Sequence, residues 1–147
     1  MKFISIIAIL VLVTLSTADE YVVKSYEDLL EYRKECVADL KVPEANIELY
    51  KKLEFPNDQI TQCYLKCIFT KFGLFDTKTG FDVESVHKQL VGNQAEAADH
   101  DKEVHAKIQA CVDKNEQGSN ACEWAYRGVT CILKNNVALV NQQHKKP

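Results

Sequence analysis

A chain of 147 residues, less its N-terminal leader, suits a single domain. Its formal net charge is −3, and an acidic chain without a basic stretch argues against a nucleic-acid partner. Six cysteines, an even number behind an apolar leader, predict a disulfide framework in an oxidising compartment.

The leader, residues 1–18, has the features of a secretion signal. Lys2 gives it a positive start, residues 3–15 are almost wholly apolar, and small residues precede the end of the segment at Ala18. A membrane anchor needs about 20 apolar residues, so this run is too short to be one, and no second run of spanning length follows. We therefore expect cleavage after Ala18 and secretion of residues 19–147 as one extracellular domain.

The rest of the chain predicts an all-α, compact six-helix domain. The helices are expected in this order: a first capped by Ser25, a second opened by Pro43 and running through Leu53, a third from Asn57 or Asp58 to about Phe72, a fourth from Asp82 to Gly92, a fifth from about Asp99 to Val112, and a sixth capped by Ser119 or Asn120. Residues 76–80 have the composition of a turn. Four residues of the first helix are expected to face inward: Leu29, Leu30, Val37 and Leu40.

The third helix is apolar around more than half of its circumference. A helix that is apolar on most sides is buried on most sides. Two interpretations stay open at this point. Either the helix packs fully against its neighbours, or one of its flanks lines a cavity.

The pair Cys63 and Cys67 lies on one face of that helix, because residues four apart in a helix are neighbours. Each is therefore expected to bind a different segment, although six cysteines permit many pairings and the spacing does not choose among them. In the chain-entropy account, a bridge over loops of this length stabilises a fold by about 3–4 kcal/mol. A fold held in this way tolerates an incomplete core, so an internal cavity is physically allowed.

The spacing C-x26-C-x3-C-x43-C-x10-C-x8-C resembles that of the insect odorant-binding proteins, the six-cysteine pheromone-binding and general odorant-binding group. The segments CYLKCIFTKFGLFD from Cys63 and ACEWAYRGVTC from Ala121 are also similar to that family. The resemblance extends from Ser25 through the C-terminal tail, and its long x43 interval implies an extended loop near residues 92–100. It implies six helices that enclose an apolar pocket, with these bridges: Cys36–Cys67, Cys63–Cys122 and Cys111–Cys131.

The resemblance implies a secreted carrier that binds and solubilises small hydrophobic molecules, such as odorants, pheromones or fatty acids, in chemosensory lymph. It implies no cofactor. The candidate ligand-binding residues are Leu65, Phe69, Thr70, Phe72, Phe75, Val86, Leu90, Trp124, Val129 and Ile132. Each of them is equally compatible with ordinary core packing. Thr70 and Tyr126 could offer a hydroxyl to the ligand, although Thr70 could instead bond back to its own helix.

Two further features have a proposed role in ligand exchange. Residues 137–140 are apolar and are predicted to cover one opening of the pocket, with a disordered tail as the alternative. Relatives in the family release ligand in acid, and histidines titrate between roughly pH 5 and 8. Four histidines are the candidate sensors unless they are merely solvated: His87, His100, His105 and His144.

Enzyme and metal motifs do not fit the sequence. There is no Gly-x-Ser-x-Gly segment, and His100 and His105 are five residues apart rather than the four of a zinc protease motif. Zinc binding by Cys63 and Cys67 would need reduced thiols, which secretion disfavours. We therefore predict a protein that is not an enzyme and holds no metal ion.

The expected partner is a small hydrophobic ligand, and the resemblance adds a chemosensory receptor as a second partner. We expect no nucleic acid, no membrane span, and a monomer or weak dimer. Two alternative functions remain. One is a fatty-acid or lipid carrier in a non-olfactory tissue or fluid, and the other is a disulfide-rich protein–protein interaction module with a filled core.

Overall fold

The computed structural model describes residues 19–92 and 98–135 and, within them, all side chains except those of residues 98–101. The described elements are, in chain order, α1 (Tyr26–Leu40), α2 (Glu44–Lys51), α3 (Gln59–Lys71), β1 (Phe75–Asp76), β2 (Gly80–Phe81), α4 (Val83–Val91), α5 (Ala98–Cys111) and α6 (Ala121–Lys134). The predicted all-α, six-helix class is confirmed. Over these residues, none of the helices combines the length and the apolar character that crossing a membrane requires.

Three expectations concern residues that the structure does not describe. The leader over residues 1–18 and the apolar tail residues 137–140 lie outside the described ranges. The loop expected near residues 92–100 lies partly outside them. These expectations stay predictions.

The helix starts follow from local capping chemistry. Ser25 and Asp28 form a reciprocal capping box at α1, in which each side chain accepts the backbone N–H of the other. Asp58, Asp82 and Asn120 cap α3, α4 and α6, each accepting a hydrogen bond from the backbone N–H three residues later. Each cap satisfies an N–H that has no partner within its helix, which typically contributes about 1 kcal/mol.

The prediction that the second helix includes Leu53 is wrong. The helix ends at Lys51, and Leu53 takes a left-handed conformation (φ +59°) with 55 % of its surface exposed. The reason is a closing motif: the Leu53 N–H bonds to the Tyr50 carbonyl and the Glu54 N–H bonds to the Leu49 carbonyl. These two bonds satisfy the last carbonyls of α2 and turn the chain away from the helix axis.

The prediction that Leu30 faces inward is also wrong. Leu29 is buried, Val37 and Leu40 are partly buried, and Leu30 is 47 % exposed. Leu30 lies on the flank of α1 next to α2 and α3, where it borders an open depression rather than the core.

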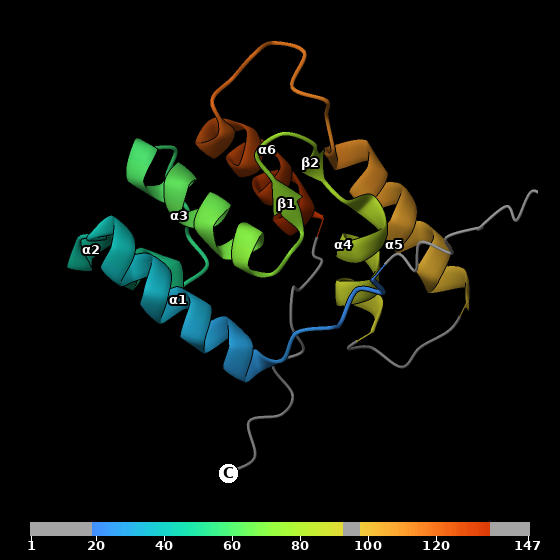
Figure 1. Ribbon diagram of the computed structural model, residues 1–147, viewed down its shortest axis with the longest axis horizontal. Helices are drawn as coiled ribbons and strands as arrows, with labels where there is room; N and C mark the ends of the chain where they lie inside the picture. The colour runs from blue at the N-terminus through green and yellow to red at the C-terminus, as the bar shows by residue number, and fades with distance from the viewer. Residues whose placement is uncertain (1–18, 93–97, 136–147) are drawn as a thin grey trace, which may run out of the picture.

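The centre of the fold is the packing of α3 against α6. Figure 1 shows α1 and α2 on one side of this pair and α4 and α5 on the other. A short antiparallel hairpin lies beside them, with Phe75 opposite Phe81 and Asp76 opposite Gly80. The Asp76 carboxylate closes the hairpin turn by accepting the backbone N–H groups of residues 78 and 79. The predicted turn over residues 76–80 is therefore confirmed.

Three disulfides join the helices. Cys36–Cys67 links α1 to α3, Cys63–Cys122 links α3 to α6, and Cys111–Cys131 links α5 to α6. They are the pairs that the family resemblance implies. Cys63 and Cys67 bind different segments, so α3 is fixed on both sides.

Candidate functional site

An aromatic cluster of Phe69, Phe75, Phe81 and Trp124 occupies the space between α3, the hairpin and α6. The ring of Phe75 lies edge-on to Phe81 and to Trp124, with centroids 4.9 and 5.4 Å apart. Phe69 lies edge-on to Phe81 at 5.9 Å, and all four side chains are buried. Each edge-to-face pair stabilises by about 0.5–1.5 kcal/mol beyond the burial of its surface. Three of the predicted ligand-binding residues thus meet in one aromatic cluster.

The ten predicted ligand-binding residues divide clearly by burial. Nine of the ten are buried in the same hydrophobic core: Leu65, Phe69, Phe72, Phe75, Val86, Leu90, Trp124, Val129 and Ile132. Thr70 is exposed. It follows the buried Phe69 by one residue, and one residue in an α-helix turns the side chain by more than a quarter of a turn. Its hydroxyl therefore lies on the solvent side of α3.

Two glycines make room for the aromatic cluster. A Cβ atom at Gly128 would lie within 3.0 Å of three ring carbons of Phe81, and one at Gly80 would lie within 3.2 Å of three ring carbons of Trp124. Phe81 and both glycines were not among the predicted site residues. A signal was available at Gly128, because a glycine inside a helix costs about 1 kcal/mol relative to alanine and usually has a packing reason.

The N-terminal segment, residues 21–24, is held against α4 by the buried side-chain amide of Gln89. Gln89 has an exposed fraction of 0 %. Its Oε1 accepts hydrogen bonds from the Tyr21 hydroxyl and the Lys24 backbone N–H, both at 2.8 Å, and its Nε2 donates to the Lys24 carbonyl at 3.0 Å. Burial raises the pKa of the Tyr21 phenol, which therefore stays a neutral donor. The segment thus covers the helix that carries Val86 and Leu90.

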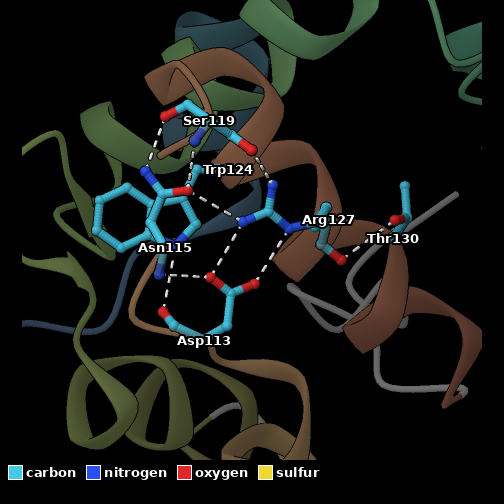
Figure 2. Close-up of polar contacts among 6 residues, drawn as sticks. All are labelled: Asp113, Asn115, Ser119, Trp124, Arg127 and Thr130. Carbon is cyan, nitrogen blue, oxygen red and sulfur yellow. Dashed lines mark hydrogen bonds and ion pairs between the residues drawn. The ribbon is translucent and has the colours of Figure 1, made fainter. Parts of the chain in front are cut away.

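The loop between α5 and α6 is held by Arg127 (Figure 2). The guanidinium donates to both carboxylate oxygens of Asp113 at 3.1 Å and to the side-chain oxygens of Asn115 at 3.2 Å and Ser119 at 2.7 Å. The hydrogen bonds from Arg127 lower the pKa of the Asp113 carboxyl group. The Trp124 indole N–H donates to the Asp113 carbonyl at 3.2 Å. The orientation of Trp124 in the aromatic cluster is therefore tied to this loop.

Two of the open depressions on the surface are lined by described residues. One, of about 450 Å³, is lined by Leu53, Phe55, Asn57, Tyr126, Thr130, Leu133 and Lys134. The Tyr126 hydroxyl donates to the Phe55 carbonyl at 2.8 Å, so it joins α6 to the α2–α3 connection and lies apart from the aromatic cluster. The other depression, of about 320 Å³, lies between α1, α2 and α3. Among the described residues that line these two depressions, none is one of the ten predicted ligand-binding residues.

Titratable side chains join α4 to α5. The rings of His87 and His105 lie edge to face with centroids 5.1 Å apart, and the His105 Nε2 lies 2.9 Å from a carboxylate oxygen of Glu84. The side chains of His100 and His144 lie outside the described residues. Acid sensing by these histidines stays a prediction. Within the described part of the chain, no group of three or more His, Cys, Asp or Glu side chains is arranged to hold a metal ion.

The chain is similar to known proteins over most of its length. Residues 18–135 match the PBP/GOBP family. General odorant-binding protein 99a of Drosophila melanogaster is 60% identical over 136 residues, which cover 92% of this chain and 93% of that protein. Odorant-binding protein 22 of Aedes aegypti is 43% identical over 141 residues, covering 95% and 96%.

A solved structure supports the same relationship. The structure of Anopheles gambiae odorant-binding protein AgamOBP22a with the bound odorant cyclohexanone is 27% identical, with a TM-score of 0.56, and the match covers 71% of this chain and 88% of that one. The family match, these relatives and the six-helix fold with three bridges agree. The chain belongs to the PBP/GOBP family of insect odorant-binding proteins.

Proposed function

We propose that this protein carries small hydrophobic molecules in its interior, between α3, the hairpin, α4 and α6. The observation that carries the proposal is the buried aromatic cluster, which lies at the meeting point of helices joined by two disulfides. The relative AgamOBP22a binds the odorant cyclohexanone, a small ketone that is mostly hydrocarbon, which supports this ligand class.

The driving force for binding is removal of apolar ligand surface from water. It is worth about 25 cal/mol for each Å² buried, so a volatile or fatty molecule gains more from an apolar interior the larger it is. The nine buried residues named above are the proposed wall. Thr70 is not part of this proposal, because it is exposed, and the aromatic cluster offers the ligand apolar contacts with ring edges and faces.

The experiment that tests the proposal uses the chain's single tryptophan. Trp124 is buried in the aromatic cluster, so a ligand that enters there changes its fluorescence. We expect a saturable change near one ligand per chain with an apolar ligand, and competition among cyclohexanone, volatile alcohols and long-chain fatty acids then ranks the ligand classes.

A matched pair of variants makes the test specific. Val129→Phe narrows the proposed interior and is expected to weaken binding, whereas Thr70→Val, on the exposed side of α3, is expected to leave it unchanged. If fluorescence shows no saturable change while mass spectrometry confirms all three bridges, the carrier function is refuted and the interaction module with a filled core remains.

We also propose that the protein is secreted after cleavage behind Ala18 and works in extracellular fluid. Its family and its three disulfides support this location, because disulfides persist in oxidising compartments. Expression in insect cells and sequencing of the protein recovered from the medium tests it. An N-terminus at Asp19 is the expected result, and retention inside the cells would refute it. A chemosensory receptor is the proposed downstream partner in olfactory lymph.

A further inference from the structure

A second apolar site lies on the outside of the molecule, away from the aromatic cluster. The depression of about 320 Å³ between α1, α2 and α3 is hereafter the outer groove. Its apolar lining comes from Leu30, Val37, Ile47, Tyr50 and Tyr64. Pockets that hold small ligands have volumes of about 300–1,000 Å³, so the outer groove is large enough for a small molecule or one alkyl chain.

The lining of the outer groove is unusually apolar for a surface position. Leu30 is 47 % exposed, although it borders the buried side chains of Tyr50 and Tyr64. The two tyrosine rings stack with centroids 4.3 Å apart, and the Tyr50 hydroxyl is satisfied by Thr61 at 2.8 Å. The floor is therefore rigid and already packed. A ligand would find it preformed and would gain by covering Leu30.

Three cations surround this apolar floor, on a chain whose net charge is negative. Arg33 and Lys34 come from α1 and Lys51 comes from α2. Lys51 is already paired with Glu48. Among the described residues, neither Arg33 nor Lys34 forms an ion pair. These two side chains are therefore available to an anion at the groove.

Arg33 lines the outer groove together with Tyr64. Burial raises the pKa of the Tyr64 phenol, and the positive charge of the nearby Arg33 guanidinium acts against that rise. An anionic group placed there would meet Arg33 and the phenol together, while an attached alkyl chain would run over Leu30, Val37 and Ile47.

We propose that the outer groove is a second ligand site, for a single-chain amphiphile with a carboxylate head. A purely apolar ligand would leave Arg33 and Lys34 unpaired, and a small inorganic anion would gain nothing from the apolar floor. Only a molecule with both parts complements the groove. The site is formed by α1, α2 and α3 and shares no lining residue with the proposed interior wall, so it does not depend on the proposed function.

The test is a titration with sodium decanoate, followed by NMR of the side-chain methyl groups. Leu30, Val37 and Ile47 report on the outer groove, whereas Val86 and Val129 report on the interior. We expect a saturable shift of the three groove methyls. Their dissociation constant is expected to differ from that of the interior methyls, because the two sites share no residue. Methyl decanoate, which lacks the charge, is expected to shift the groove methyls much more weakly.

Two double variants distinguish the effect of the groove cations on binding from the effect of the protein's overall charge. In Arg33→Gln with Lys34→Gln, decanoate is expected to bind the groove roughly tenfold more weakly, since two charge-assisted contacts are lost. Lys78→Gln with Lys114→Gln removes the same charge from exposed positions elsewhere and is expected to change nothing.

The outcomes for the two sites are distinguishable. The outer site is refuted if the groove methyls show no saturable shift, or if both double variants bind decanoate equally well. Failure of the interior methyls to respond, with the groove methyls responding, would count against the proposed function alone.

Discussion

Gly128 offers a sharp test of how tightly the interior is packed. It lies inside α6, where alanine is ordinarily the better helix residue by about 1 kcal/mol. A Cβ atom there would come within 3.0 Å of three ring carbons of Phe81, whereas ordinary van der Waals contacts begin at about 3.4 Å. In Gly128→Ala, a gain in stability from helix propensity is therefore opposed by a loss from the steric clash with Phe81.

The packing effect is expected to be the larger of the two. Phe81 is buried, and Phe69 and Phe75 lie against its ring, so the ring cannot swing away freely. Inserting a methyl group into such a core costs about 1–3 kcal/mol. Because the ring is held on two sides, we use the upper part of that range, about 2–3 kcal/mol. The gain in helix propensity offsets about 1 kcal/mol of this cost. Gly128→Ala is therefore expected to destabilise the protein by about 1–2 kcal/mol.

The assay is equilibrium unfolding in guanidinium chloride of the oxidised protein, followed by circular dichroism. The midpoint is expected to fall without a change in the slope. The double variant Gly128→Ala with Phe81→Leu provides the control, because the smaller side chain makes room for the new methyl group. Its loss of stability is expected to be smaller than the sum of the two single losses. A Gly128→Ala protein as stable as the parent, or more stable, would refute the reasoning.

Three further predictions concern polar contacts. Asp113→Asn is expected to destabilise the protein at neutral pH, because the lowered pKa of this carboxyl in the folded state reflects its hydrogen bonds to Arg127. The difference in the free energy of unfolding between parent and variant is expected to disappear in acid. It is lost as the pH falls below the unfolded-state pKa of 3.8 and through the folded-state pKa, where the parent carboxyl becomes protonated. Gln89→Leu is expected to speed hydrogen exchange at the Lys24 amide, which loses its acceptor. Ser25→Ala is expected to cost about 1 kcal/mol in the free energy of unfolding through loss of the N-cap.

Each of these has a direct control or a contrary outcome. Glu116→Gln removes an exposed carboxylate from the same loop and is expected to leave the pH dependence of stability unchanged. Exchange at the Lys24 amide that matches the parent protein would contradict the role given to Gln89. Ser25→Asn keeps a capping oxygen and is expected to retain most of the stability that Ser25→Ala loses.

The starts of the helices could be predicted because they depend on residues only three positions apart. Ser25 and Asp82 cap α1 and α4 as predicted, and Asp58 and Asn120, each one of two adjacent candidates, cap α3 and α6. The end of α2 could not be predicted in this way. Leu53 occupies a left-handed position that usually takes glycine. The turn is accompanied by a contact between residues on either side of it, in which Phe55 stacks on Tyr50 with ring centroids 5.6 Å apart.

The burial of Leu65 and Phe69 was predictable from the apolar surface of α3, but the details of the site were not. Phe81 and Gly128 are far apart in the sequence, and only the packing of the hairpin on α6 brings them together. Thr70 could not be separated from its buried neighbours by composition, because the side of α3 that faces water depends on where α1 and α6 pack. For the same reason, the helical spacing of apolar residues predicts a core position for Leu30, which lies instead at the outer groove.

The disulfides also divide the molecule into helices with a covalent cross-link and helices without one. They join α1, α3, α6 and α5 into one covalently connected unit, whereas α2 and α4 contain no cysteine. The hairpin and α4 lie between Cys67 and Cys111 in the chain and carry no bridge of their own, so a movement of α4 breaks no disulfide. Such a movement would break the hydrogen bonds that join Gln89 to the Tyr21 hydroxyl and the Lys24 backbone, so these bonds would oppose the entry of any ligand that needs α4 displaced.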